Sequence, residues 1–263
     1  MKAIGLFFLI LVSSCNFKNS SVTDSRVYEK DTINLEEVNT TDSVVYDNDT
    51  LTIYRIDSIS FLSARNNVKA NRDSLPYISD FDAAKKILKG RVVFGGYNSD
   101  THLIDSTLDG EMICAVHFSN GKSIITNENQ FFWEAGFVRY YPSEDILLCE
   151  GGHSSDVSIN LKNGSFGADI VGNPEYIVSS PSGKYRLNGW FPGQECSDYF
   201  LQKKTPTDYQ LFTRIPMDVS KEGFDFCTLI DIFWLDDANI YFRNTYFEVE
   251  DDPRLGYFRI MIK

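Results

Sequence analysis

Apolar and polar residues alternate with a period of two in the later part of this chain, and this alternation restricts the fold more than any other feature. Residues 157–162 read Val-Ser-Ile-Asn-Leu-Lys, and residues 258–263 read Phe-Arg-Ile-Met-Ile-Lys. Side chains of a β-strand point alternately to opposite faces, so each segment predicts a strand with one wetter face. Asn120-Gly121 and Asn163-Gly164 lie between apolar runs, and Asn-Gly favours the type I′ turn of a β-hairpin. The sequence therefore predicts antiparallel strands joined by short turns.

Composition supports a mainly β fold and limits the partners. The 263 residues include 20 Phe and 14 Tyr, and aromatic side chains suit pleated, half-buried surfaces. The chain has 37 acidic and 25 basic residues, which gives a formal net charge of -12. This charge opposes binding to phosphate backbones, so we expect no nucleic acid as a partner.

One short helix is predicted ahead of the strands, over residues 79–89. Ser79 is a suitable N-cap, Asp82 places negative charge in the first turn, and three lysines precede Gly90. The cap, the charges and the terminating glycine all agree with a helix. Its apolar stripe is narrow, so we expect it to cover an edge or an end of a sheet.

The first fourteen residues have the pattern of a secretory signal peptide. Lys2 supplies a positive charge, residues 4–12 form an apolar run, and two small serines precede Cys15. The apolar run is too short to span a bilayer as a stable helix. The sequence therefore predicts export to the cell envelope and removal of residues 1–14.

The segment Val12-Ser13-Ser14-Cys15 resembles the lipobox of bacterial lipoproteins. The resemblance implies that Cys15 is acylated on sulfur and becomes the first residue after cleavage. Two or more acyl chains hold a protein on a bilayer, whereas one chain gives only marginal binding. In this family an Asp after the cysteine often signals retention at the inner membrane. Asn16 stands there instead, so the resemblance implies a lipid anchor in the outer membrane of a Gram-negative bacterium.

Residues 15–50 are predicted to form an acidic, flexible tether. They are rich in Ser, Thr, Asn and Asp and contain few large apolar residues in any periodic pattern. Such a segment cannot bury enough apolar surface to offset its ordering entropy. We expect the rest of the chain, residues 51–263, to be a single β-rich domain.

Three turn-containing segments resemble the blades of WD40 and TolB-type β-propellers. They begin at Tyr141-Pro142, Ser180-Pro181 and Leu235-Asp236, and each precedes an apolar run. The resemblance implies antiparallel meander sheets in a partial or small propeller-like fold. Propeller blades usually take about 40 to 50 residues, so few blades fit into this domain. A two-sheet β-sandwich remains an open alternative.

Four cysteines follow Cys15, and none belongs to a Cys-x-x-Cys motif. Cys114 and Cys149 lie in or beside apolar runs and are expected as small core residues of strands. Cys196 and Cys227 have polar neighbours, and an oxidising envelope permits disulfides. If one disulfide forms, we expect it to join Cys196 and Cys227.

Catalytic and metal-binding patterns are sparse. The segment Gly152-His153-Ser154-Ser155-Asp156 differs from the Gly-x-Ser-x-Gly elbow of hydrolases, because an aspartate replaces the second glycine. No metal-ligand spacing connects the three histidines, which are His102, His117 and His153. Four acids in the β region are expected at the surface or in turns: Glu134, Glu150, Asp231 and Asp236. We therefore expect no catalytic residue, no metal and no cofactor.

Aromatic doublets provide the one candidate binding surface. Neighbouring residues of a strand face opposite sides, so in a sheet with a single core one ring of each doublet faces solvent, whereas sheets that stack face to face bury both rings as core. The doublets are Phe131-Phe132-Trp133, Trp190-Phe191, Tyr199-Phe200, Phe233-Trp234 and Tyr246-Phe247. Trp190 precedes Phe191, Pro192 and Gly193 at the expected end of a strand, so Trp190 and Phe191 are the favoured platform.

Two classes of function agree with these features. The first is a non-catalytic envelope lipoprotein that binds a protein or a glycan. The second is an envelope hydrolase acting on glycosides or esters through a pair of carboxylates in a cleft.

Overall fold

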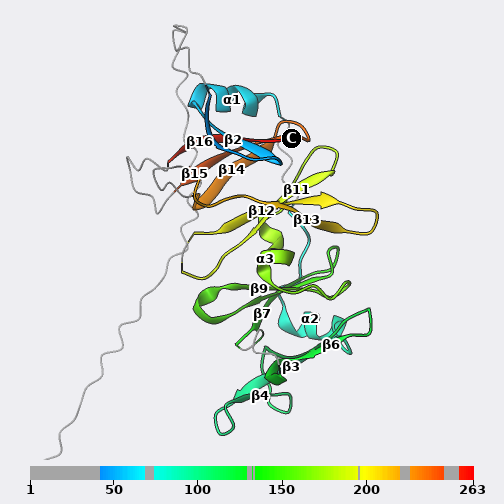
Figure 1. The fold of residues 1–263 in the computed structure, drawn as a ribbon. Coiled ribbons are helices and arrows are strands. Elements are labelled where there is room, and N and C mark those ends of the chain that lie inside the picture. Colours follow the sequence, from blue (N-terminus) through cyan, green and yellow to red (C-terminus); the bar gives the residue numbers. More distant parts are fainter. Residues whose placement is uncertain are drawn as a thin grey trace, which may run out of the picture. The chain divides into compact units, whose positions relative to one another are not determined.

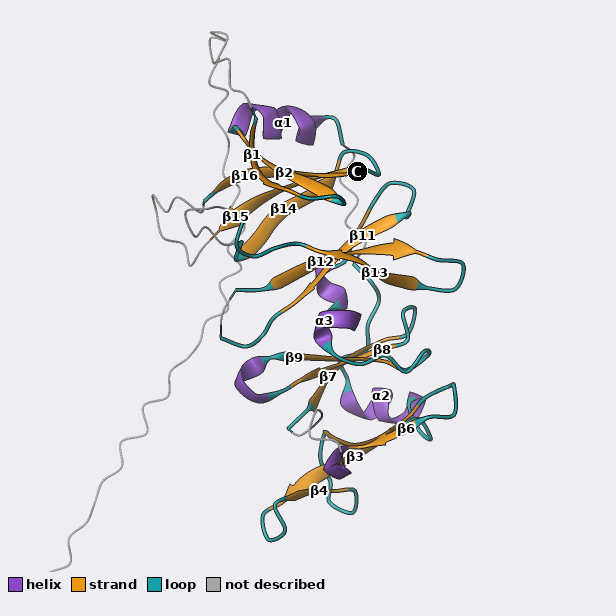
Figure 2. Ribbon diagram, viewed as in Figure 1, coloured by secondary structure: helices purple, strands orange, loops and turns teal. Residues whose placement is uncertain are grey.

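The computed structural model describes residues 42–68, 74–128, 132, 134–194, 196–219, 226–245 and 255–263. The predicted signal peptide, Cys15, Asn16 and the tether up to residue 41 lie outside the described residues. Residues 40–263 belong to one compact unit. Antiparallel sheets dominate the described part, one of them strongly curled, which confirms the predicted mainly β class (Figures 1 and 2).

The first sheet is five-stranded and brings the start of the described chain next to its end. Its order is β1-β2-β16-β15-β14, with antiparallel pairing throughout. Its strands are β1 (Ser43–Asp47), β2 (Leu51–Ile56), β14 (Thr228–Trp234), β15 (Asn239–Thr245) and β16 (Gly256–Ile262).

The other two sheets use the middle of the chain. The four-stranded sheet is a simple meander of β10 (Val178–Ser179), β11 (Tyr185–Trp190), β12 (Asp198–Lys204) and β13 (Tyr209–Arg214). The seven-stranded sheet has the order β4-β3-β5-β7-β8-β9, with β6 paired to β5. Its strands are β3 (Val92–Asn98), β4 (Leu103–Asp105), β5 (Met112–His117), β6 (Ser123–Ile125), β7 (Gly136–Tyr141), β8 (Ile146–Glu150) and β9 (Asp156–Asn160).

Each sheet contains one of the three blade-like turns in a hairpin. The turns connect β7 to β8, β10 to β11, and β14 to β15. Hairpins of different sheets also contact one another. Glu144 accepts a hydrogen bond from Nη1 of Arg186 at 2.8 Å, and Asp237 accepts one from the backbone N–H of Ser182 at 3.0 Å. The β10–β11 turn and the β14–β15 turn each include an edge strand, whereas β7 and β8 are internal strands of their sheet.

The type I′ prediction for the two Asn-Gly turns is wrong. Gly121 and Gly164 have φ values of 83° and 82°, but neither preceding asparagine has a positive φ, and a type I′ turn needs both. The N–H of Gly121 donates to the carbonyl of Phe118 at 3.0 Å, so the turn begins earlier. Both loops are longer than two residues, and a left-handed glycine after an ordinary turn closes such loops.

The predicted helix is present as α2 (Phe81–Ile87), shorter than expected at both ends. Its N-cap is Asp80 and not Ser79, because the Asp80 carboxylate accepts from the N–H of Ala83 at 2.7 Å. Beyond the helix, Gly90 has a φ of 83°.

Two further helices are present that we did not predict. They are α1 (Ser58–Asn66), which Asp57 caps, and the single turn α3 (Ala168–Val171). Short 3-10 turns are η1 (Thr126–Glu128), η3 (Gly152–Ser154) and η4 (Pro174–Tyr176). None of the described helices has the length and apolar character needed to cross a membrane.

The boundary predicted between tether and domain is wrong by several residues, because β1 falls inside the stretch expected as tether. This strand pairs with β2, and Val45 and Tyr46 pack against the buried core. At the sheet edge, Arg259 donates from Nη2 to Asp42 at 2.9 Å. Val45 and Tyr46 are half-buried at this sheet edge, whereas Val44 is exposed.

The four-stranded sheet is covered on both faces. One face joins the five-stranded sheet in an apolar core that includes Tyr185 and Leu187. On the opposite face, Asn188 donates to the carbonyl of Val171 in α3 at 3.1 Å, and Arg186 reaches Glu144. Separate cores lie under α1 and under α2. The four-stranded sheet thus has one apolar and one polar interface.

Candidate functional site

Trp190 and Phe191 lie where β11 ends, and both are half-buried. Strand periodicity places Trp190 on the same face as Arg186 and Asn188, the polar face of the four-stranded sheet. The indole Nε1 of Trp190 is buried and has no hydrogen-bond partner in the described part of the chain. The predicted platform is therefore partly open and partly packed.

Asp156, the first residue of β9, fixes the chain that follows Trp190. Its backbone N–H donates to the carbonyl of Phe191 at 2.8 Å, and the N–H of Phe191 donates to its carboxylate at 2.7 Å. Nδ2 of Asn173 donates to the other carboxylate oxygen at 3.0 Å. Burial raises the pKa of Asp156, although these hydrogen bonds act in the opposite direction. The backbone of Phe191 is thereby fixed to β9 of the seven-stranded sheet.

The loop before Asp156 has an unusual backbone. His153 and Ser154 have φ values of 60° and 61°, a left-handed conformation that non-glycine residues rarely adopt. Gly193 is packed against this loop so closely that a Cβ there would lie 2.5 Å from the carbonyl oxygen of His153. Nε2 of Gln194 also lies 2.8 Å from Nδ1 of His153. Strained positions often cluster at functional sites, and here they contact Gly193 and Gln194 in the loop that follows Trp190.

Two of the four acids expected at the surface or in turns, Glu134 and Glu150, lie at this loop. The hydroxyl of Ser154 donates to Glu150 at 3.3 Å, and a Cβ on Gly152 would lie 2.9 Å from Oε2 of Glu134. Ser154 therefore has a carboxylate as its partner and not His153, whose Nδ1 contacts Gln194. The pairing of a serine with a histidine base is not formed at this loop.

The other two acids have local roles. Asp231 lies 3.6 Å from the guanidinium of Arg243, and Asp236 accepts hydrogen bonds from the backbone of Ala238 and Asn239 in the β14–β15 turn. Asp231 has a φ of 52° where the pairing of β14 with β15 is irregular. Neither acid shows a contact with the loop of Ser154.

Cys196 and Cys227 form a disulfide shortly after the platform loop, as the sequence led us to expect. Both residues are buried, and the N–H of Ser197 donates to the carbonyl of Cys227 at 3.1 Å. The bridge joins the chain entering β12 to the chain entering β14. Cys114 is half-buried and Cys149 is fully buried, both are free, and burial raises the pKa of both thiols.

The other doublets are buried wherever they are described. Tyr199, Phe200, Phe233 and Trp234 are all at most 4% exposed. Nε1 of Trp234 donates to the carbonyl of Val178 at 2.8 Å. Both faces of these strands are covered, which leaves no ring of the pair for solvent. Phe132 is also buried, whereas Phe131, Trp133 and Tyr246-Phe247 lie outside the described residues.

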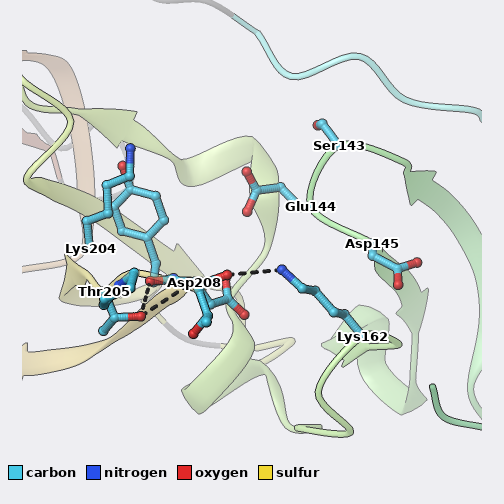
Figure 3. A pocket seen from close by; sticks show the side chains of 10 residues that line it. Ser143, Glu144, Asp145, Lys162, Lys204, Thr205 and Asp208 are labelled. Carbon is cyan, nitrogen blue, oxygen red and sulfur yellow. Dashed lines mark hydrogen bonds between the residues drawn. The ribbon is translucent and has the colours of Figure 1, made fainter. Parts of the chain in front are cut away.

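A polar hollow of about 240 Å³ lies between the β7–β8 turn and the β12–β13 hairpin (Figure 3). Lys162 reaches across it and donates to the carbonyl of Thr207 at 3.0 Å. Its carboxylates also have partners: Glu144 binds Arg186, and Asp145 binds Arg91 through two hydrogen bonds. The polar groups of this hollow are therefore already engaged in structural contacts, and Lys162 connects the loop after β9 to the β12–β13 hairpin.

Among the described residues, no group of three His, Cys, Asp or Glu side chains is placed to hold a metal ion. The half-open Trp190-Phe191 loop, fixed by Asp156 and set against the strained His153 loop, is the best candidate site. No protein-family model, curated protein or solved structure matches the chain.

Proposed function

We propose that this chain is a lipid-anchored envelope protein whose β domain binds a protein or glycan partner without catalysis. The observation that carries the binding role is the fixed position of Trp190 and Phe191. A rigid loop loses little entropy on binding, and half-open aromatic rings contribute strongly to contacts with proteins and glycans. Exposed His153, Ser154 and Gln194 supply polar groups beside the rings.

The anchoring part of the proposal rests on residues 1–16 of the sequence. The apolar run and Cys15 support acylation, and Asn16 supports placement in the outer membrane. The acidic residues that follow would hold the domain away from the lipid. Cys15→Ala should move the protein out of the membrane fraction after a carbonate wash, and its retention there would contradict the anchor.

The recurrence of a similar turn in one hairpin of each sheet supports a finer proposal about the architecture. We infer that the sheets are blade-like units of a small, propeller-like stack. The four-stranded meander β10–β13 has the strand number and consecutive order of a propeller blade.

Binding is tested with the full-length protein on a glycan array and on separated envelope proteins. Trp190→Ala should abolish the signal that the wild-type protein gives, while its thermal unfolding remains cooperative. Tyr97→Ala is the matched control, because Tyr97 is an exposed aromatic residue, 48% accessible, on another strand. Equal binding by wild-type protein and Trp190→Ala would remove the platform from the proposal.

A hydrolase remains the second candidate, and the strained His153-Ser154 backbone with Glu150 beside it is the observation in its favour. Turnover of chromogenic glycosides or esters by the wild-type protein, lost in Glu150→Gln, would establish it. Unchanged turnover in that variant would assign the activity elsewhere or to a contaminant.

A further inference from the structure

A cavity of about 340 Å³ lies between the β12–β13 hairpin and the segment from β9 to α3. It adjoins the hollow of Figure 3, with which it shares Asp208 and Tyr209. Three nearly buried polar side chains line it, each at most 7% exposed: Asn160, Arg186 and Gln202. We call it the donor cavity, after the hydrogen-bond donors of these side chains.

Hydrogen bonds fix the orientation of both amides. Oε1 of Gln202 accepts from Nε of Arg186 at 2.7 Å and from Nδ2 of Asn188 at 3.2 Å. Oδ1 of Asn160 accepts from the backbone N–H of Lys162 at 3.0 Å and from the next N–H at 3.1 Å. A flipped amide would set N–H groups against these donors, so the NH₂ groups must be the remaining atoms.

Three hydrogen-bond donors in the cavity are left without an acceptor. Nε2 of Gln202, Nδ2 of Asn160 and Nη2 of Arg186 make no hydrogen bond within the described part of the chain. None of them is among the fully buried polar atoms that lack a partner, so each keeps some access to solvent. Nearly buried donors of this kind gain most from an acceptor that fills the space.

Much of the remaining wall is apolar or already hydrogen-bonded. Ile146, Ile170, Val171 and Leu211 form the apolar part of the lining. Leu211 is directly opposite Gln202 in the β12–β13 pairing, so it stands beside the donors. The Asp208 carboxylate accepts from Nδ2 of Asn163 at 3.1 Å and from the N–H of Tyr209 at 2.8 Å.

We propose that the donor cavity binds a small carboxylate with a short, branched aliphatic group. The carboxylate accepts from the three nitrogens, one of which belongs to a guanidinium and gives a charge-assisted hydrogen bond. The aliphatic group covers Ile170 and Leu211, which are 47% and 42% exposed without it. This site is separate from the Trp190-Phe191 platform and does not depend on the function proposed for it.

The test uses isobutyrate and isobutyramide as probes in ligand-detected NMR titrations of the full-length protein. We expect saturable binding of isobutyrate and about tenfold weaker binding of the isosteric amide, which lacks the charge. Gln202→Glu and Asn160→Asp keep the accepting oxygen but replace the donor with a negative oxygen. Each should weaken isobutyrate binding about tenfold or more.

Two controls separate the site from general effects. Asn67→Asp makes the same chemical change at the exposed C-cap of α1 and should leave binding unchanged. Leu211→Glu changes a half-exposed wall residue, so it tests the site even if a buried variant does not fold, and it should also weaken binding. No saturable isobutyrate binding, equal binding of the amide, or full binding by Leu211→Glu and the folded donor variants would each overturn the proposal.

Discussion

Asp156 and Phe191 exchange two hydrogen bonds, one between backbones and one from the N–H of Phe191 to the Asp156 carboxylate. This pair connects the seven-stranded sheet to the loop that presents Trp190. A carboxylate so placed accepts two hydrogen bonds but loses hydration, and burial has the larger effect on its pKa. The connection is therefore sensitive to pH.

The first prediction concerns this sensitivity. Burial raises the folded-state pKa of Asp156 above its unfolded value of about 3.9, so the folded state binds the proton more tightly. The free energy of unfolding of the wild-type protein, relative to Asp156→Asn, should therefore fall as pH rises from about 4 through the raised pKa. Urea unfolding across that range measures it.

Asp105 provides a control of opposite sign. Hydrogen bonds from Thr107 lower the pKa of Asp105, so wild-type stability relative to Asp105→Asn should rise with pH. A flat or rising difference curve for Asp156→Asn would contradict the first prediction.

The second prediction compares two tryptophans. Trp234→Phe removes the donor to the buried carbonyl of Val178, so it should lower the free energy of unfolding by about 1 to 3 kcal/mol beyond the loss of ring area. Trp190→Phe removes an N–H that has no partner among the described residues, so it should cost less. Chemical denaturation of both variants checks the order, and equal losses would count against it.

The third prediction concerns the ion pair of Arg186 with Glu144. The Arg186 side chain is only 4% exposed, so Glu144→Ala leaves a buried charge without its partner. We expect a loss of about 3 kcal/mol or more in unfolding free energy. Asp109→Ala breaks an exposed pair with Lys85 at 3.5 Å and should cost less than about 1 kcal/mol. Similar losses in the two variants would show that burial does not matter here.

The fourth prediction concerns the disulfide. It closes a loop with a sequence separation of 31, and the chain-entropy relation gives about 3 to 4 kcal/mol of stability for a loop of that length. Cys196→Ser with Cys227→Ser should lose that amount in denaturant unfolding. Alkylation of the unfolded, unreduced Cys15→Ala protein should label two thiols, Cys114 and Cys149. Labelling of four would exclude the bridge in solution.

The fifth prediction concerns the start of the domain. A chain beginning at Leu51 lacks β1. Its absence leaves β2 as the edge strand, paired only with β16, and uncovers part of the core. It should unfold at a lower temperature than a chain beginning at Thr40. The chain from Thr40 should match the full-length protein. Equal melting of the two shortened chains would restore residue 51 as the boundary.

Much of the secondary structure could be predicted, because it depends on local signals. Alternation identified β9 and β16, and capping residues identified α2 to within two residues at each end. The helix α1 was missed although Asp57 is a good N-cap, because its apolar face contains only Phe61 and Ala64 as buried residues. A stripe that narrow gives little periodicity to detect.

The candidate site could be predicted only in part. Strand-end position identified Trp190, and polar neighbours identified Cys196 with Cys227. The role of Asp156 could not be predicted, because its partner Phe191 lies 35 residues away, just after a strand of another sheet. Arg186 and Asn188 alternate with other residues of β11, but alternation alone does not show that another part of the chain covers that face.

The two faces of the four-stranded sheet should respond differently to salt. Sulfate strengthens the apolar interface with the five-stranded sheet, while ionic strength screens exposed charged contacts on the other side, such as Arg214 of β13 with Asp169 of α3. The strands β3–β9 with α2 have an apolar core of their own, so they have the means to open as one cooperative unit. Hydrogen exchange should therefore show two protection levels whose separation depends on the salt. The unit of β3–β9 with α2 would open away from the four-stranded sheet at the polar interface, where the Trp190 loop and the donor cavity both lie.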